Sequence, residues 1–137
     1  MIRALALLTG LAAASAAAAQ PAPVTTVLKR TQATSAGQPI VMPQGALQVT
    51  ISETTIPPHG ALPVHKHPYP RYVYVLSGRV RVTNLDTGQA AELKAGDMTI
   101  DPVGQWHRAE ALDEDAVRLI TVDQAPPGAA TTVLREP

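Results

Sequence analysis

This sequence predicts an all-β fold, built as one small sandwich or barrel, and three observations carry the prediction. A length of 137 residues suits a single domain. Short segments of alternating apolar and polar residues recur along the chain, separated by turns that use many of its 9 Gly and 13 Pro residues. No segment keeps a helical period over three turns, so helices are not expected to shape the domain.

Residues 1–19 have the pattern of a secretory signal peptide. Arg3 is followed by an uncharged run of Leu and Ala, and small residues precede Gln20. We expect cleavage after Ala19 and secretion, most simply to the periplasm. The alternative is a membrane anchor, but the apolar stretch is short for a bilayer and no second one follows. No stable membrane span is expected after cleavage.

The remaining chain has a nearly neutral and cysteine-free composition. Without Arg3, 10 Lys and Arg residues stand against 11 Asp and Glu residues, and there is no basic stripe. We therefore expect no nucleic-acid partner. The absence of Cys excludes disulfides and thiolate metal ligands. Because Phe is also absent, Val, Leu, Ile and Ala have to fill the core.

The expected elements follow in order. Residues 20–45 form a leader with a first strand at 24–31, residues 46–123 form the core, and residues 124–137 form a tail with a possible short strand at 131–134. The core begins with a strand at 46–56, in which Leu47, Val49 and Ile51 share one face. Turn residues and alternation predict five more strands, over 71–77, 79–84, 90–94, 97–101 and 105–112, and a last one over 116–123.

The histidines show a spacing that suits a metal site. His65 and His67 are two residues apart, so on a strand both side chains leave the same face, with Cβ atoms roughly 7 Å apart. A third histidine, His107, follows the tight turn Pro102-Val103-Gly104. Read alone, the His-x-His pair is either a pair of ligands or solvated loop residues.

The wider context of these histidines resembles the two conserved motifs of the cupin superfamily, in particular its small, single-domain, exported members with a type-2 conserved barrel. The residues that carry the likeness are Gly60, His65, His67 and Gly78 in the first motif, and Gly96, Pro102, Gly104 and His107 in the second. The resemblance implies a double-stranded antiparallel β-barrel, the cupin jelly roll. It also implies that His65, His67 and His107 hold one divalent metal ion inside the barrel.

Arg71 is the main departure from these motifs, because it occupies the position of a glutamate ligand; Ala111 replaces a motif asparagine. A guanidinium cannot bind a metal. At about 5 Å it would repel a bare divalent ion by roughly 6 kcal/mol at an effective dielectric constant of about 20. Three arrangements would relieve this: Arg71 turns away, an anion bridges it to the metal, or the pocket binds an anion without metal. Three imidazoles favour Zn, Cu, Fe or Ni over Mn.

Other side chains are candidates around this site. His59 is either a fourth ligand or acid–base group, or a solvated loop residue. Alternation places Tyr69, Arg71, Val73 and Val75 on the interior face and Tyr72 and Tyr74 on the other. The acids that could replace the missing glutamate are Glu53, Asp101 and Glu110.

Two functions remain open at this point. The resemblance implies dioxygenase-, lyase- or isomerase-like chemistry on a small organic acid or phenolic, with Arg71 orienting a substrate anion. The alternative is a non-catalytic module in which Arg71 and the histidines bind an anionic ligand. The cupin fold hosts many chemistries, so the reaction does not follow from it. A homodimer is expected, with Trp106 at a subunit contact.

Overall fold

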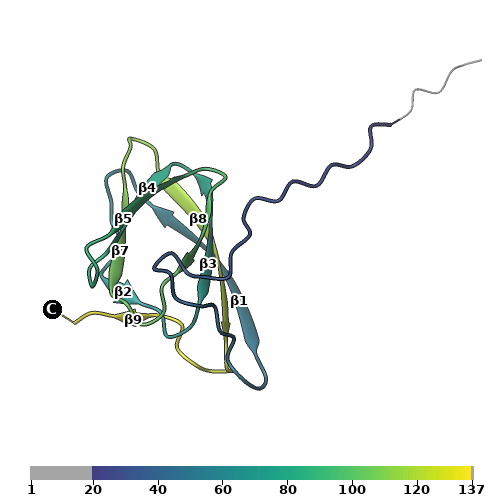
Figure 1. Cartoon of the computed structure of the whole chain (residues 1–137). Helices are drawn as coiled ribbons and strands as arrows, with labels where there is room; N and C mark the ends of the chain where they lie inside the picture. Colours follow the sequence, from purple (N-terminus) through teal and green to yellow (C-terminus); the bar gives the residue numbers. More distant parts are fainter. Residues whose placement is uncertain (1–19, 137) are drawn as a thin grey trace, which may run out of the picture.

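The computed structural model describes residues 20–136, and the described chain is all-β with two antiparallel sheets (Figure 1). The predicted signal peptide lies outside the described residues. One sheet has the order β1-β8-β3-β6 and the other β5-β4-β7-β2-β9. The strands are β1 (Gln48–Ile56), β2 (His65–Lys66), β3 (Arg71–Ser77), β4 (Arg79–Asn84), β5 (Ala90–Lys94), β6 (Met98–Asp101), β7 (His107–Ala111), β8 (Val117–Ala125) and β9 (Val133–Leu134).

The two sheets lie face to face around an aliphatic core, as the composition predicts (Figure 1). The strands alternate in burial, which is clearest in β8, where every second side chain from Val117 to Ala125 is buried. Both sheets contribute to the core: Ile56, Val73, Val75, Val117 and Leu119 come from one, and Val80, Ala109 and Ala111 from the other. The all-β jelly-roll prediction is confirmed. Within residues 20–136, no helix could cross a membrane.

The chain passes between the two sheets at Gly78, which joins β3 to β4. This residue has φ of 78°, a left-handed conformation that favours glycine. A Cβ atom here would also lie 2.9 Å from the carbonyl oxygen of Ala116. Glycine is therefore required both by the backbone angle and by the close approach of the loop before β8.

The prediction of a strand over 24–31 is wrong for the single chain. These residues form no strand and extend away from the barrel (Figure 1), with Val24 87% and Leu28 62% exposed. Their β-branched composition favours a strand, but a strand needs a partner with which to pair. The leader is hydrogen-bonded to the barrel at Ser35, whose amide donates to Ile100 O.

The apolar face of β1 points outward, since Val49 is 56% and Ile51 68% exposed. The pairing extends this face across the sheet, because Ile51 lies opposite Val122, which lies opposite Tyr72. The opposite face of β1 carries Thr50, Ser52 and Thr54 before it reaches the buried Ile56. Alternation in β1 was therefore predicted correctly, but the sheet turns its apolar side to the surface.

The C-terminal tail returns to the histidine end of the barrel. β9 falls within the predicted short strand at 131–134 and pairs with β2. The amide of Arg135 donates to Val64 O, which fixes the tail beside the His65–His67 segment. Residues more than 60 positions apart in sequence thus meet around the histidines.

Candidate metal centre

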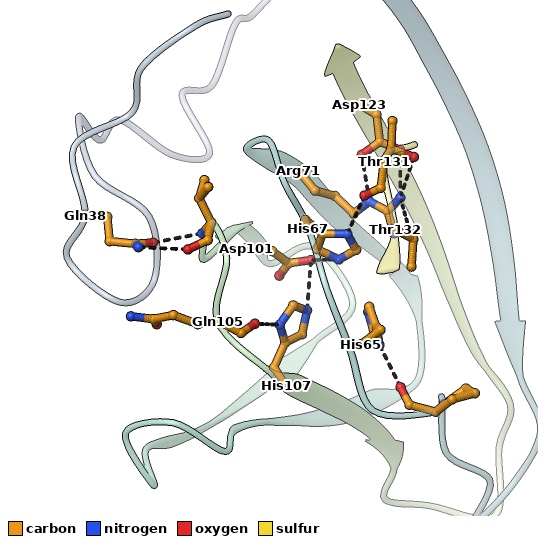
Figure 2. A network of polar contacts seen from close by, with 12 residues as sticks. Gln38, His65, His67, Arg71, Asp101, Gln105, His107, Asp123, Thr131 and Thr132 are labelled. Atoms are coloured by element: carbon orange, nitrogen blue, oxygen red, sulfur yellow. Dashed lines mark hydrogen bonds and ion pairs between the residues drawn. The ribbon is translucent and has the colours of Figure 1, made fainter. Parts of the chain in front are cut away.

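The structure brings His65, His67 and His107 together inside the barrel (Figure 2). His65 on β2 lies directly opposite His107 on β7. His67 follows in a bridge to Val103, and Gly104, with φ of 73°, donates its amide to His67 O. The three rings have centroids 4.5 to 5.0 Å apart, and their available nitrogens all lie within 4.8 Å of one another.

Backbone carbonyls select the same tautomer for all three imidazoles. The Nδ1 atoms of His65, His67 and His107 lie 2.7, 2.8 and 2.9 Å from the carbonyl oxygens of Pro63, Thr131 and Gln105 respectively. Because a carbonyl can only accept, each Nδ1 carries the hydrogen and each Nε2 keeps a free lone pair. The Nε2 atoms of His67 and His107 are buried and have no hydrogen-bond partner within residues 20–136.

Burial also keeps these imidazoles neutral. It lowers the pKa of His67 to about 3, with a further contribution from the Arg71 charge. Burial lowers the pKa of His65 and His107 as well, against the opposing effect of their carbonyl hydrogen bonds. Neutral imidazoles with free, converging Nε2 atoms are the form that binds a metal. The donor set therefore fits a divalent ion.

Asp101 at the end of β6 is the carboxylate that faces this cluster. Its Oδ2 lies 3.5 Å from Nε2 of His67 and 3.9 Å from Nε2 of His107 (Figure 2). The residue is only 7% exposed, and burial raises its pKa to about 6 although the Arg71 charge acts in the other direction.

Arg71 binds a protein carboxylate. Its Nε and Nη2 atoms donate to the two oxygens of Asp123 at 2.8 Å each, and Nη2 also donates to Thr132 Oγ1 at 2.9 Å (Figure 2). Of the three arrangements considered, this is closest to the first, with the guanidinium charge neutralised by Asp123. Asp123 was missed from the sequence, although it is in phase with the buried Leu119 and Thr121 of β8.

The interior cavity beside the histidines is small. Its volume is about 50 Å³, and its walls combine aliphatic side chains with the hydroxyls of Thr54, Thr99 and Thr121 and with the charged residues Arg71 and Asp101. A larger cleft of about 460 Å³ adjoins it and shares Thr99 and Asp101 with it. The residues that line this cleft include polar groups but no Lys or Arg; they are Ser35, Ala36, Val82, Asn84, Gln89, Ala90, Ala91, Leu93, Thr99, Asp101 and Pro102.

The remaining candidate residues lie outside the cluster. His59 has a side chain 61% exposed and pairs with Glu114 at 3.1 Å. Glu53 pairs with Arg118, and Glu110 with Arg108.

Two aromatic candidates are also placed by the structure. Tyr69 lines a surface groove with Pro68 and Pro70 and not the interior cavity, because the two prolines interrupt the alternation between β2 and β3. Trp106 is partly covered by its own chain, with Lys66 Nζ 4.5 Å from its ring centroid.

The metal-free protein should lose stability as the pH falls from about 7 to about 5. Burial holds the folded-state pKa of His65, His67 and His107 below 6.5, so each takes up a proton on unfolding at lower pH. Asp101 opposes this, because its pKa of about 6 makes it take up a proton on folding. We expect the stability lost through the three imidazoles to exceed the stability gained through the one carboxyl as the pH falls. Thermal unfolding after chelation should show a lower Tm at the lower pH; an equal or higher Tm would contradict this.

Comparison with known proteins agrees with the fold and the donor set. A family model described as a cupin domain matches residues 52–123, which is more than half of the chain. No curated protein matches this chain.

Several solved structures share the architecture. An uncharacterized double-stranded β-helix protein from Klebsiella pneumoniae subsp. pneumoniae is 27% identical, with 65% of this chain and 76% of that chain covered and a TM-score of 0.54. The polyketide cyclase RemF from Streptomyces resistomycificus is 25% identical, with coverages of 71% and 68% and a TM-score of 0.55. The oxalate decarboxylase of Bacillus subtilis, which has Mn(II) centres, is 21% identical, with coverages of 63% and 23% and a TM-score of 0.54. This chain therefore spans about a quarter of that enzyme.

Proposed function

Because this chain belongs to the cupin family, we propose that it is a metal-dependent enzyme acting on a small organic molecule through dioxygenase-, lyase- or isomerase-like chemistry. One observation carries the proposal. Three backbone carbonyls hold three buried imidazoles in the tautomer that points free Nε2 lone pairs at a common centre. Buried polar atoms without partners are costly unless they serve a ligand. A divalent ion bound there would supply Lewis acidity or redox chemistry and leave positions open to substrate.

The surrounding residues define the substrate that this site would accept. The small interior cavity takes only a few non-hydrogen atoms, so the reacting end of the substrate enters it while the rest occupies the adjoining cleft. Aliphatic walls exclude water, and the hydroxyls of Thr99 and Thr121 are available to orient an oxygen-bearing group. The cleft has no cation to attract a strongly anionic substrate.

The pairing of Arg71 favours the enzyme over the anion-binding alternative. A ligand carboxylate could form a bidentate pair with Nε and Nη2 only by displacing Asp123 from two 2.8 Å hydrogen bonds, in a site where Asp123 is only 3% exposed. Bidentate pairs of this kind are among the strongest polar contacts in proteins. We therefore propose that Arg71, although it lines the interior cavity, acts through the architecture of the site and does not form a bidentate pair with the substrate.

Protein purified without added metal should contain one divalent ion per chain, measured by elemental analysis, and chelation should lower its Tm because only the folded state binds the ion. Imidazoles suit Zn, Cu, Fe and Ni, and a nearby carboxylate also accommodates Mn. Finding no ion, with no rise in Tm when each of these metals is added back, would refute the proposal.

Turnover distinguishes an enzyme from a binding module. We expect the metal-loaded protein, and not the chelated one, to convert at least one compound from a panel of small phenols, diketones and organic acids. Oxygen consumption measured alongside product formation separates dioxygenase-like from lyase- or isomerase-like chemistry. Tight binding of panel members with no product would favour the binding module.

We also propose that the protein is exported and forms a homodimer. Residues 1–19 support export by their composition. The outward apolar face of β1 around Val49 and Ile51 supports self-association, because exposed apolar surface of this kind favours contacts with other chains. Light scattering of the purified chain tests the dimer, and a replacement of Ile51 by Lys should shift the population toward monomer.

A further inference from the structure

We infer that Asp101 is a fourth metal ligand, replacing the glutamate that the first cupin motif places at position 71. The inference rests on the proposed metal site and specifies its composition as three imidazoles and one carboxylate. It gives a ligand role to Asp101, the residue directly before Pro102 of the second motif. The motifs themselves assign no ligand at the position of Asp101. Four observations from the structure support it.

The first observation is the distance from the carboxylate to the imidazoles. Metal–nitrogen and metal–oxygen bonds of about 2.0–2.2 Å place neighbouring ligand atoms about 3.0–3.5 Å apart in octahedral or tetrahedral sites. Asp101 Oδ2 lies 3.5 and 3.9 Å from the Nε2 atoms of His67 and His107. These separations are long for hydrogen bonds but close to those of atoms that share one ion.

The second observation is the strand register. Arg71 on β3 and Asp101 on β6 are direct partners in the antiparallel ladder. Side chains at such positions leave the same face with Cβ atoms about 4.5–5.5 Å apart. A carboxylate on β6 can therefore reach the volume that a glutamate on β3 would reach. The carboxylate of this chain therefore lies one strand away from the motif position but beside the same imidazoles.

The third observation is how the charges in this row are distributed. Asp123, Arg71 and Asp101 lie side by side across β8, β3 and β6. Arg71 directs its hydrogen bonds to Asp123, while the hydrogen bonds of residues 20–136 include none to the Asp101 carboxylate. A buried charge is retained only where a partner compensates it. The two free Nε2 atoms beside Asp101 point to a cation as that partner.

The fourth observation is that the other candidate acids are engaged elsewhere. Glu53 lies 2.6 Å from Arg118, and Glu110 lies 3.0 Å from Arg108, both at the exposed side of their strands. Neither lines the interior cavity, whereas Asp101 does. They therefore serve as matched controls for loss of one carboxylate charge.

The test compares wild type with Asp101→Asn, Glu53→Gln and Glu110→Gln, using Zn²⁺ and Co²⁺ as probes. Dissociation constants come from competition with a chromophoric chelator, and the visible absorption of the Co²⁺ form reports the ligand set. We expect Asp101→Asn to weaken binding at least about tenfold, since even partners that only orient ligands are worth 10–100-fold. Its Co²⁺ spectrum should change, while both controls match wild type in affinity and spectrum.

Folding is checked on the metal-free proteins. Asp101→Asn should melt at no lower temperature than wild type, because it removes a buried charge without cutting a hydrogen bond. If Asp101→Asn misfolds, Asp101→Glu, which keeps the carboxylate, serves as the second variant and should retain metal with an altered Co²⁺ spectrum.

Three results would overturn the ligand assignment. They are unchanged affinity in Asp101→Asn, weaker binding with an unchanged Co²⁺ spectrum, and an equal loss in a control variant. A role for Asp101 as a proton acceptor alone would give the first of these. If wild type itself binds neither probe, the proposed metal site has failed, which is distinct from failure of Asp101 alone.

Discussion

Replacing Arg71 with Met should lower the free energy of unfolding by about 3–5 kcal/mol, the range measured when one partner of a buried ion pair is removed. Asp123 would remain at 3% exposure without its two hydrogen bonds from the guanidinium. Thr132 would lose its donor too. The change is measured by urea unfolding of the metal-free protein. A loss below about 1 kcal/mol would show that the pair is solvated and unimportant.

A double variant separates the charge from the shape of the side chain. Arg71→Met combined with Asp123→Leu removes both charges, so most of the lost stability should return, because apolar replacements of buried ion pairs are often neutral or better. If the double variant is as unstable as Arg71→Met, then the aliphatic packing of Arg71, and not the stranded carboxylate, accounts for the loss.

Arg71 also connects the barrel to the histidine cluster through the tail. It donates to Thr132, and the neighbouring carbonyl of Thr131 accepts from His67 Nδ1 at 2.8 Å. The guanidinium therefore anchors the segment that orients one imidazole. The permanent cation beside the three histidines is thus explained by two features: Asp123 neutralises it, and its hydrogen bonds hold the segment whose carbonyl orients His67.

The sequence could predict those parts of the fold that depend on local alternation. β3, β4 and β8 follow the expected period, because each has one buried and one wet face. The strand expected at 24–31 fails because pairing is not a local property, and these residues have no neighbouring strand among residues 20–136. Periodicity likewise could not predict which way the apolar face of β1 points, because alternation identifies two faces but not which one is inside.

The candidate site also has parts that the sequence predicted and parts that it did not. The motif spacing predicted that His65, His67 and His107 would meet, and the structure places them within 4.8 Å. Asp101 could only be one of three candidate acids until the register of β3 against β6 was known. Asp123 and the Thr131 carbonyl come from segments over 50 residues away in sequence, and contacts at such separation carry no spacing signal.

Metal affinity should fall at least about a hundredfold in His67→Asn, since loss of a ligand should cost at least as much as the 10–100-fold loss seen for its outer partners. Asn is chosen because its amide nitrogen takes the place of Nδ1, so it can still donate to Thr131 O while the Nε2 lone pair is gone. The hydrogen bond is kept, but the smaller side chain leaves part of a fully buried position unfilled, so the metal-free protein should lose roughly 1–3 kcal/mol of stability. Chelator competition and thermal unfolding measure the two quantities.

His59→Asn is the matched control for this substitution, because it makes the same chemical change at a histidine that lies outside the cluster and is 61% exposed. We expect it to alter the dissociation constant less than twofold. If both variants lose metal equally, binding depends on surface histidines and not on the barrel interior. If neither loses metal, the ion is held without His67, and the convergence of Nε2 atoms on which the site was identified has no role in binding. Only a loss confined to His67→Asn agrees with an ion held by imidazoles whose tautomers are set by the backbone.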